Sequence, residues 1–399
     1  MLIAETPLGK PISLYLARHN SPLITHLRTQ PLICPSCKSS VIIKSGEKVM
    51  PHFAHKSKAA CSGFSENESV FHLHAKTALN HWFSQQSLFT ELEKNYPQIK
   101  RRTDISVQYS KAEFAIEVQC SPISADILQL RSADYRKIGI IPFWILPSEF
   151  IQKASMVKLS SFHQQFIRYS PATGQYYLLT YSPVSQSFTI YNHLTPLSKT
   201  LFLTSYNVIL QNTINFPSFP IKRFHMTDKL YAVHLKMNEK WLLNLLKYRR
   251  SVRDPLMRKL YETNLPLFEA PPWIGLMLKN NMIFSCSPME WQIHLYVIMK
   301  KEKVFYKQQL ISELKQLIHW RVLHVRSILE PLPEHIYTEA VEELINVLSQ
   351  CEIIEKNRSG YVLDETIASQ QINAQNRSYH LNNFHHQMKK VIIQEYNRR

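Results

Sequence analysis

No part of the sequence approaches about 18 consecutive apolar residues, the length that a helix needs to cross a membrane. The N-terminus, Met-Leu-Ile-Ala-Glu-Thr-Pro-Leu-Gly-Lys, lacks the apolar h-region of a secretory signal peptide. The sequence also contains no convincing internal repeat and no low-complexity stretch. These absences argue against membrane-spanning, secreted and repeat proteins, and we expect a cytoplasmic globular protein.

Cysteine is scarce as well. Six cysteines spread over 399 residues do not make a disulfide framework. Three of them lie between residues 34 and 61, and this grouping indicates a metal site in a reducing compartment. The length allows two or three domains, and an apolar content of 45% permits real hydrophobic cores.

Negative charge is nearly missing from the middle of the chain. Residues 151–260 carry 15 Lys/Arg against 3 Asp/Glu, whereas residues 1–150 carry 17 against 12 and residues 261–399 carry 15 of each. The formal net charge of +17 predicts an acidic partner, and nucleic acid is the commonest one. The middle segment is therefore the expected electrostatic footprint of that partner.

Cysteine and histidine spacing predicts a zinc site near the N-terminus. Residues 34–37 read Cys-Pro-Ser-Cys, and residues 52–55, about fifteen positions later, read His-Phe-Ala-His. Such pairs on two hairpins can supply four tetrahedral ligands for Zn²⁺. The alternatives are a ribbon that keeps the fold without the metal, or paired surface histidines. The expected ligands are Cys34, Cys37, His52 and His55, with Cys61 as a possible replacement for one histidine.

Residues 101–121 are predicted to form two strands joined by a turn at Ser110-Lys111. Side chains alternate faces along a strand, so pairing the strands back from this turn sets Asp104 opposite Glu117. Directly paired residues have Cβ atoms roughly 4.5–5.5 Å apart, and two carboxylates that close repel each other. A hard divalent cation with oxygen ligands is the obvious candidate to lie between them.

A helix is predicted before these strands. Residues 65–68, Ser-Glu-Asn-Glu, have the form of a capping box, and apolar residues keep a helical spacing to about Ser84. Glu68, His72 and Lys76 recur at every fourth position and share one face. This face is either a solvated stripe with favourable charge order or, next to the two strands, a functional surface.

The remaining pattern predicts an α/β core followed by a helical tail. A strand at 88–92, a helix at 124–137 that Gly139 stops, and a buried strand at 140–146 complete the order helix, three strands, helix, strand. Residues 1–30 are predicted as short strands and turns. A β meander is expected over 176–210, and helices are expected from about Met237, over 287–301, 305–328, 333–350 and 378–397.

This order, with an Asp on the second strand and Glu-x-Gln on the third, resembles the restriction-endonuclease-like PD-(D/E)xK core. More closely, the whole chain resembles the competence protein CoiA family of Gram-positive bacteria. The matching stretches are Cys34-Pro-x-Cys37 with His52-Phe-Ala-His55, Glu68-x3-His72-x3-Lys76, Arg102-Thr-Asp104-Ile, Ile116-Glu117-Val-Gln119-Cys-Ser121, Tyr135 before Gly139, the strand at 144–146, Pro272-Trp-Ile-Gly275 and Glu290-Trp-Gln292.

The resemblance implies three domains and a role after DNA uptake in natural transformation. A zinc-ribbon-like β module is expected at 1–62, a nuclease-like domain with an αβββαβ core at 63–150, and a basic, mainly α-helical domain at 151–399. Asp104 and Glu117 would bind Mg²⁺ or Mn²⁺, helped by the Val118 carbonyl and by Glu68.

The resemblance also assigns roles around this pair. Gln119 stands where the wider superfamily has Lys, and its amide can orient a water or a phosphate oxygen but cannot supply positive charge. Lys76 would supply that charge, with His72 as a proton shuttle or phosphate contact. The expected DNA contacts are Arg102, Arg131, Tyr135, Arg249 and Arg250.

Three functions compete at this point. The first is a metal-dependent endonuclease that acts on single-stranded or branched recombination DNA, which Asp104, Glu117 and Lys76 favour. The second is a recombination mediator that binds DNA without cutting it, which Gln119 favours. The third is an adaptor whose helical tail recruits recombination proteins. In the first two, the basic segment follows the DNA backbone, and four aromatic residues either stack on bases or belong to the core: Phe224, Tyr231, Trp241 and Tyr248.

Overall fold

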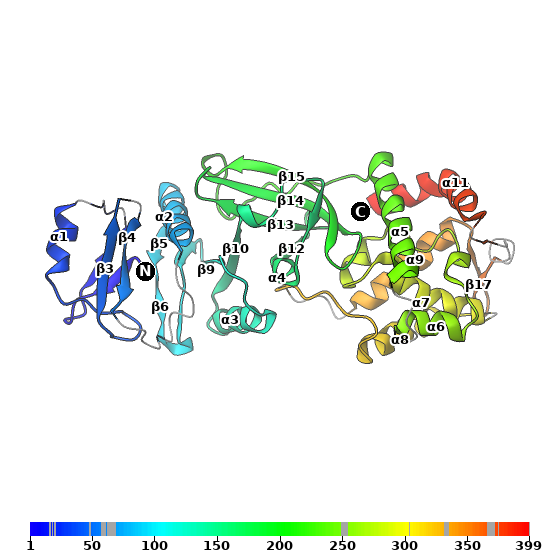
Figure 1. Cartoon of the computed structure of the whole chain (residues 1–399), viewed down its shortest axis with the longest axis horizontal. Coiled ribbons are helices and arrows are strands. Elements are labelled where there is room, and N and C mark those ends of the chain that lie inside the picture. The colour runs from blue at the N-terminus through cyan, green and yellow to red at the C-terminus, as the bar shows by residue number, and fades with distance from the viewer. Residues whose placement is uncertain are drawn as a thin grey trace. The chain divides into compact units, whose positions relative to one another are not determined.

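The computed structural model describes residues 1–15, 17, 19, 21–47, 49–56, 61, 69–248, 254–302, 304–330, 335–364, 372–373 and 375–398 (Figure 1). The chain forms two compact units. Unit 1 contains Met1–Gln152, Leu178–Ile190 and Tyr206–Ile221, and unit 2 contains Lys153–Tyr177, Tyr191–Ser205 and Lys222–Arg399. The division into three domains at residues 62 and 150 stays a prediction.

Unit 1 begins with a small module of two hairpins and one helix. Its elements are β1 (Ile3–Glu5), β2 (Pro11–Ser13), α1 (Pro22–Arg28), β3 (Val41–Gly46) and β4 (Val49–His55). Strands β1 and β2 pair antiparallel, and so do β3 and β4. The sequence predicted only strands and turns before residue 30, so α1 is a correction. It forms because the Ser21 side chain accepts the Ile24 N–H and because Pro22 suits a first helical position.

The predicted order of helix, three strands, helix and strand is present in the next part of unit 1. The elements are α2 (Val70–Gln85), β5 (Phe89–Leu92), β8 (Ile105–Tyr109), β9 (Ala112–Val118), α3 (Ala125–Lys137) and β10 (Ile141–Pro147), with the short pair β6 (Asn95–Tyr96) and β7 (Arg101–Arg102) between β5 and β8. The strands lie side by side in the order β5-β8-β9-β10-β13. The architecture is therefore mixed α/β around a large sheet.

The β8–β9 hairpin has the predicted turn and register. Tyr109 pairs with Ala112, so Ser110 and Lys111 form a two-residue turn, and Ser110 has the positive φ (55°) that such turns require. At the other end Ile105 pairs with Ile116. One step further along this register, Asp104 comes opposite Glu117, as the sequence predicted.

Serine side chains begin both helices of this core. Ser69 accepts the backbone N–H of His72 and begins α2, while the predicted capping box at residues 65–68 lies outside the described residues. Ser124 accepts the N–H of Ile127 and begins α3, as predicted. Gly139 has φ 76°, a conformation that glycine adopts without strain, and the strand β10 follows it.

An aromatic cluster holds the end of α2 in place. Trp82 and Phe83 on α2 contact Phe216 from the segment after β15, with ring centroids 6.4 and 5.1 Å away, and Trp82 also lies 5.1 Å from Phe188. Trp82 and Phe83 are fully buried. This packing of aromatic rings fixes α2 beside the sheet and with it the polar residues on the first half of the helix.

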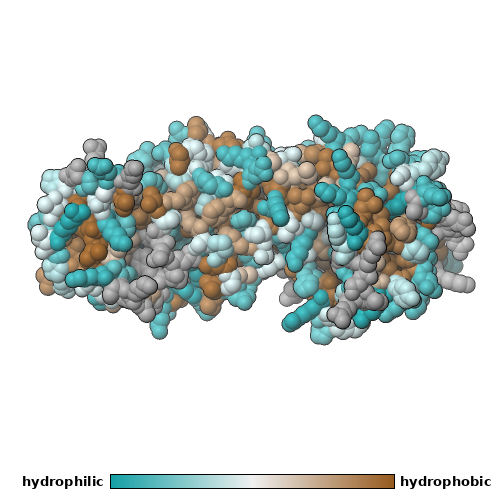
Figure 2. All heavy atoms as spheres, in the orientation of Figure 1, coloured by the Kyte–Doolittle hydropathy of each residue, from teal (hydrophilic) through white to brown (hydrophobic). Residues whose placement is uncertain are grey.

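Hydrophilic side chains cover much of the face of the molecule seen in Figure 2, with smaller apolar areas between them.

Unit 2 combines the predicted meander with a helical array. The strands are β11 (Met156–Lys158), β12 (Ile167–Ser170), β13 (Gln175–Ser182), β14 (Ser187–Pro196) and β15 (Leu201–Leu210); β13 to β15 supply residues to both units. The helices are α4 (Ser161–Gln164), α5 (Asp228–Tyr248), α6 (Pro255–Glu262), α7 (Pro288–Lys301), α8 (Lys307–His319), α9 (Ile336–Gln350) and α11 (Arg377–Asn397).

Several boundaries in unit 2 differ from the prediction. Helix α5 begins nine residues earlier than expected, at Asp228, and α8 ends at His319 instead of 328. The helix α6 and the hairpin of β16 (Ile354–Asn357) and β17 (Gly360–Leu363) were not predicted. Because α6 has only 8 residues, its periodic pattern is too short to recognise, although Asp254 and Pro255 are ordinary start signals.

The core of unit 2 contains one aromatic residue that the sequence offered for base stacking. Tyr231 is 1% exposed, while Phe224 and Trp241 are half-buried and pack against the same core. Tyr248 is 70% exposed. The buried ring of Tyr231 therefore cannot stack on a DNA base, whereas the ring of Tyr248 is exposed enough to do so.

Among the described residues, no helix combines the length and the apolar character needed to cross a membrane.

Glu113 on β9 binds three donors from neighbouring strands and turns. Its carboxylate accepts hydrogen bonds from Lys94 (2.8 Å), Tyr96 (2.6 Å) and Ser106 (2.6 Å). Burial alone would raise the pKa of Glu113, but these donors lower the pKa to about 2. Glu113 thus contributes to folding as an anion.

We expect Glu113→Gln to flatten the dependence of stability on pH. The carboxylate stabilises the fold above its ordinary pKa of 4.5, and this contribution is lost as the pH falls towards the folded-state value of about 2. Urea unfolding near neutral pH should show the variant roughly 2–3 kcal/mol less stable than wild type. The two proteins should converge in acid, and a constant difference across the pH range would contradict a contribution from ionisation.

Candidate functional site

Asp104 and Glu117 lie at the ends of two neighbouring strands in unit 1. Asp104 comes directly before β8, and Glu117 is the second-last residue of β9. β9 lies between β8, which runs antiparallel, and β10, which runs parallel, so both edges of β9 are paired within the sheet. The Glu117 residue is 3% exposed and the Asp104 side chain is 12% exposed. The two carboxylates are therefore placed in a region of low solvent access.

Helix α2 supplies two nitrogen-containing partners to Asp104. His72 Nε2 lies 2.8 Å from Asp104 Oδ2, and Lys76 Nζ lies 3.8 Å from Asp104 Oδ1. The backbone N–H of Val118 donates to the same carboxylate at 2.9 Å. Burial opposes ionisation, but His72, Lys76 and this N–H together hold the pKa of Asp104 well below its usual range. The predicted helical face of His72 and Lys76 is thus brought to the strands.

Lys76 is fully buried and forms an ion pair of 2.6 Å with Glu93. Glu93 follows β5 and has φ 54°, an uncommon conformation for a non-glycine residue. Its carboxylate also accepts the backbone N–H groups of Leu2 (2.8 Å) and Ile3 (3.2 Å), and Arg102 lies 3.7 Å away. Glu93 therefore joins the first residues of the chain to the lysine of the site.

The sequence did not identify Glu93 as a site residue. The available signal was the need for a counter-charge, because a lysine that faces a sheet from a helix is almost never buried unpaired. The two candidate acids were Glu91, on the strand predicted at 88–92, and Glu93, directly after that strand. Only the fold separates them, since the Glu91 side chain is 50% exposed and that of Glu93 is 1% exposed.

Glu117 binds two residues of α3. Arg131 donates to it at 2.8 Å, and the Tyr135 hydroxyl donates at 2.5 Å. Burial raises the pKa of Glu117, and the nearby negative charge of Asp104 raises it further, against the opposing charge of Arg131. Arg131 also lies over the Trp144 ring, 4.7 Å from its centroid.

The predicted DNA contacts of Tyr135 and Arg102 do not fit these positions. Tyr135 is fully buried and its hydroxyl is directed to Glu117, while the Arg102 side chain is 5% exposed beside Glu93. Both side chains are turned inwards because buried carboxylates need donors. The remaining predictions for Glu68, Arg249 and Arg250 fall outside the described residues.

Gln119 is buried directly after β9. Its backbone N–H donates to Ile145, and its side-chain amide donates to the carbonyl of Ser121 at 2.8 Å. The residue is 3% exposed. Gln119 is therefore anchored to the backbone that follows its own strand, and a neutral amide stands at the position where a lysine was the superfamily expectation.

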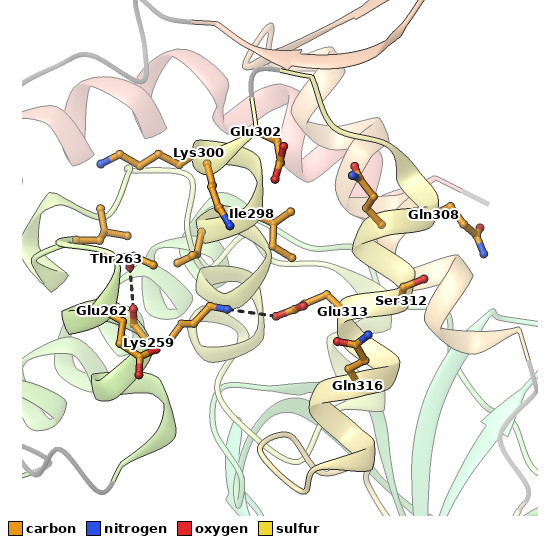
Figure 3. A pocket seen from close by; sticks show the side chains of 14 residues that line it. Lys259, Glu262, Thr263, Ile298, Lys300, Glu302, Gln308, Ser312, Glu313 and Gln316 are labelled. Atoms are coloured by element: carbon orange, nitrogen blue, oxygen red, sulfur yellow. Dashed lines mark hydrogen bonds and ion pairs between the residues drawn. The ribbon is translucent and has the colours of Figure 1, made fainter.

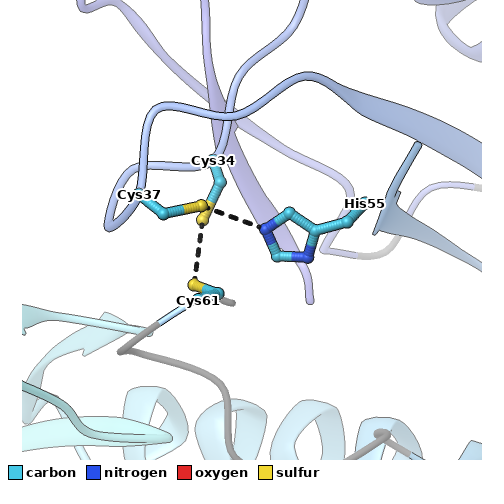
Figure 4. A group of neighbouring side chains, drawn as sticks. All are labelled: Cys34, Cys37, His55 and Cys61. Atoms are coloured by element: carbon cyan, nitrogen blue, oxygen red, sulfur yellow. Dashed lines mark hydrogen bonds between the residues drawn. The ribbon is translucent and has the colours of Figure 1, made fainter. Parts of the chain in front are cut away.

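A second cluster lies in the N-terminal module. The ligand atoms of Cys34, Cys37, His55 and Cys61 all lie within 4.8 Å of one another (Figure 4). Cys37 Sγ is 3.3 Å from His55 Nε2, and Cys34 Sγ is 3.9 Å from Cys61 Sγ. Three sulfurs and one imidazole nitrogen form a donor set that could bind zinc.

His52 is not a member of this cluster, which corrects the predicted ligand set. His52 and His55 both belong to β4, and residues three apart on a strand point to opposite faces. His52 Nδ1 instead lies 2.8 Å from the carbonyl of Met50. Cys61, the alternative ligand in the sequence, takes the fourth place.

The hydrogen bonds around Cys37 favour its thiolate form. Burial alone would raise its pKa, but hydrogen bonds from Ser39, together with those of His55 and Cys61, lower the pKa to about 6. The thiolate, which is the form that binds metal, is thus favoured at neutral pH.

Comparisons with known proteins identify the family of this chain. The family model described as "Competence protein CoiA, N-terminal domain" matches residues 16–64, and "Competence protein CoiA, nuclease-like domain" matches residues 68–223. The chain is similar to the competence protein CoiA of Bacillus subtilis (strain 168), with 27% identity over 357 residues that cover 85% of this chain and 91% of that protein. No solved structure matches significantly. From its two domain matches and this full-length similarity, the chain belongs to the competence protein CoiA family.

Proposed function

We propose that this protein is a metal-dependent DNA endonuclease of natural transformation, acting on incoming single-stranded or branched recombination DNA. The observation that carries the proposal is the pair Asp104 and Glu117 on adjacent strand ends, with Lys76 3.8 Å from Asp104. The order α2-β5-β8-β9-α3-β10 supports a PD-(D/E)xK core, in which two carboxylates and a cationic group act on a phosphodiester. The competence role extends the name of the Bacillus subtilis relative to this chain.

The donor set fits a hard divalent cation. Two carboxylates are held in a site of low solvent access, and repulsion from Asp104 is one cause of the raised pKa of Glu117. A cation bound by both oxygen groups relieves that repulsion. Asp104, Glu117 and the Val118 carbonyl are the groups that would hold Mg²⁺ or Mn²⁺. When bound, such a metal lowers the pKa of a water and neutralises charge on the phosphodiester.

The protein residues then have separate tasks. His72 holds one oxygen of Asp104 at 2.8 Å and so orients the carboxylate. Lys76 contributes positive charge from the helix, in the place of the lysine that Gln119 does not supply. Arg131 and Tyr135 hold Glu117 in its rotamer through two hydrogen bonds. We assign Tyr135 and Arg102 to the support of the site instead of to DNA binding.

The DNA itself is expected on exposed basic surface. Residues 151–260 carry 15 Lys/Arg against 3 Asp/Glu, and phosphate contacts of this kind give affinity that is independent of sequence and falls with salt. Tyr248, 70% exposed with Lys247 Nζ 5.0 Å from its ring centroid, is available for stacking on an unpaired base.

A second candidate is a recombination mediator that binds DNA without cutting it. Two observations favour it: Gln119 is anchored to Ser121 by its side chain, and Glu117 already has a 2.8 Å ion pair with Arg131. In this case the carboxylates and their cationic partners only stabilise the fold, and the basic segment alone performs the function. The two candidates make opposite predictions about cleavage.

The deciding experiment follows cleavage and binding together. Wild-type protein is incubated with labelled single-stranded, duplex and branched DNA in the presence of Mg²⁺, Mn²⁺ or EDTA. Cleavage that needs the metal supports the endonuclease. Tight, salt-sensitive binding without cleavage under every condition would establish the mediator instead.

The cluster of Cys34, Cys37, His55 and Cys61 supports a structural Zn²⁺ site within the same proposal. Its four donors are all protein side chains, so no position is left open for substrate, as in structural zinc sites. The cluster ties the β4 hairpin to residue 61, close to the start of α2 at Val70. Zinc would thus stabilise the module that contacts Glu93.

We expect Cys61→Ser and His52→Ala to differ in zinc content. Cys61→Ser removes one of four ligands and should weaken zinc binding by at least about tenfold, whereas His52→Ala should leave it unchanged. Zinc bound to the purified full-length variants is measured with a chelating dye. Loss of zinc in His52→Ala together with retention in Cys61→Ser would reverse the assignment.

A further inference from the structure

A second cavity, of about 520 Å³, lies within unit 2 and far along the sequence from the carboxylates. It is lined by residues of β12, β13, β14, α9 and α11. Three tyrosines, Tyr169, Tyr176 and Tyr396, share its wall with His193 and Lys279. Volumes of this order hold small organic ligands, and aromatic side chains on the wall favour a flat, aromatic one.

His193 is the feature of this cavity that needs a ligand to explain it. The residue is 2% exposed, and its Nε2 has no hydrogen-bond partner among the described residues. Its Nδ1 lies 3.3 Å from the Ser205 hydroxyl, and its ring stacks on Phe224 with centroids 3.4 Å apart. A buried polar atom without a partner is costly and is uncommon in folded proteins.

The backbone conformation of His193 is a second observation in favour of a ligand. Its φ is 44°, in the left-handed region, although the residue lies inside the strand β14. Such conformations cost free energy and concentrate where a side chain is held for a ligand. The uncommon backbone conformation, the stacked ring and the unpartnered nitrogen all belong to one residue that lines the cavity.

The tyrosines and the acidic residues of the wall restrict the chemical groups that the ligand can carry. Tyr169 is 45% exposed, and its ring centroid lies 5.2 Å from that of Tyr176. Glu330 and Glu339 also line the cavity, and burial followed by neighbouring negative charges, theirs included, raises the pKa of Tyr176 to about 12. Carboxylates are acceptors that suit an amino group, and they disfavour phosphate on this part of the wall, so a nucleotide would enter with its base and keep its phosphate outside.

The larger groove in unit 2 lacks these features. It measures about 870 Å³ and lies among α6, α7 and α8 (Figure 3). Lys259 and Glu313 pair across it at 3.6 Å, and lysines and glutamates occur on its wall in equal number. Among the described residues that line it, no buried side-chain polar atom is left unsatisfied. Its charges are already compensated, so it does not point to a particular ligand.

We propose that the cavity around His193 binds one unstacked nucleobase that carries an amino group. His193 Nε2 would hydrogen-bond the edge of the base, Tyr169 and Tyr176 would contact its face, and Glu330 or Glu339 would accept its amino group. The base could come from a bound DNA strand or from a free nucleotide. For the first source the inference rests on the proposed DNA binding, but it does not depend on cleavage.

The test compares two oligothymidine strands of fifteen residues, one with a central 2-aminopurine and one with a central abasic residue. Full-length wild type should bind the 2-aminopurine strand about tenfold more tightly, because stacking of one base is worth about one to three kcal/mol. Tyr169→Ala should remove this preference. Tyr261→Ala is the matched control, since Tyr261 is an 80% exposed tyrosine of the same unit outside the cavity.

Two further measurements keep the result decisive. His193→Phe keeps the ring and removes the hydrogen bond, and an unchanged melting temperature verifies its fold. Free dAMP, titrated calorimetrically, separates the two sources of the base. Binding of dAMP that Tyr169→Ala abolishes supports the site even if no strand binds and the proposed DNA function fails. Strand binding without preference, and without dAMP binding, would overturn the site and leave the DNA function intact.

Discussion

Asp104→Asn and Glu117→Gln are each expected to reduce metal-dependent DNA cleavage by at least about a thousandfold. A bound divalent metal supplies several kcal/mol of transition-state stabilisation, and each 1.36 kcal/mol corresponds to tenfold in rate, so loss of one carboxylate ligand removes most of the acceleration. Both substitutions are nearly isosteric and keep a hydrogen-bond acceptor for His72 or Tyr135. Cleavage is measured in Mg²⁺ and in Mn²⁺.

Glu113→Gln is the matched control for this experiment. Glu113 lies on the same strand as Glu117, four residues earlier and therefore on the same face, and it is also hydrogen-bonded. It should keep cleavage within about threefold under conditions where all three variants are folded. DNA binding should be unchanged in every case. Cleavage above about a tenth of the wild-type rate in either site variant would contradict the metal role of that carboxylate.

Glu93→Gln is expected to lower the free energy of unfolding by about 3–5 kcal/mol. The substitution removes the carboxylate that lies 2.6 Å from the buried Lys76 ammonium, and removing one partner of a buried ion pair costs about this much. It also weakens the acceptor of the Leu2 and Ile3 N–H groups, so the first strand should loosen with the site. Urea unfolding measures the loss.

Glu91→Gln provides the control for this prediction. Glu91 lies two residues earlier, with a side chain 50% exposed and an ion pair to Lys94 of 3.8 Å, so its loss should cost less than about 1 kcal/mol. The double variant Lys76→Met with Glu93→Gln removes both charges and should recover much of the stability lost by Glu93→Gln alone. A double variant less stable than the single one would show that the cost of Glu93→Gln comes from its contacts with Leu2 and Ile3 rather than from the lysine.

The ion pair between Lys76 and Glu93 also links the proposed site to the first residues of the chain. Glu93 connects β5, the helix α2 and the first residues of the chain, and Lys76 connects Glu93 to Asp104. A change in the N-terminal module can therefore reach the cationic group of the site through two contacts.

Local sequence patterns were sufficient to predict much of the α/β core. The turn at Ser110-Lys111 and the register that sets Asp104 opposite Glu117 were confirmed, because a two-residue hairpin leaves little freedom in pairing. The helix after Ser124 began where its cap predicted. In contrast, α6 and the β16–β17 hairpin were missed, because elements this short gain their stability from packing and not from their own periodicity.

The site was predictable where its residues share one short element, and less so elsewhere. His72 and Lys76 lie one turn apart on α2, so the sequence placed them together. Tyr135 was expected to face DNA, but it lies in the interior and binds Glu117. A helical pattern tells which residues share a face, and it does not tell which face meets a buried carboxylate.

The sequence by itself determined the CoiA family resemblance, the order of the core elements, and the pairing of Asp104 with Glu117, all of which depend on neighbours in the chain. Tertiary structure decided that Cys61, and not His52, completes the group of candidate zinc ligands, and that Glu93 pairs with Lys76. Both outcomes depend on which segments distant in sequence pack together. Strand geometry places His52 and His55 on opposite faces of β4. The fold buries Glu93 beside Lys76 and leaves Glu91 exposed to solvent.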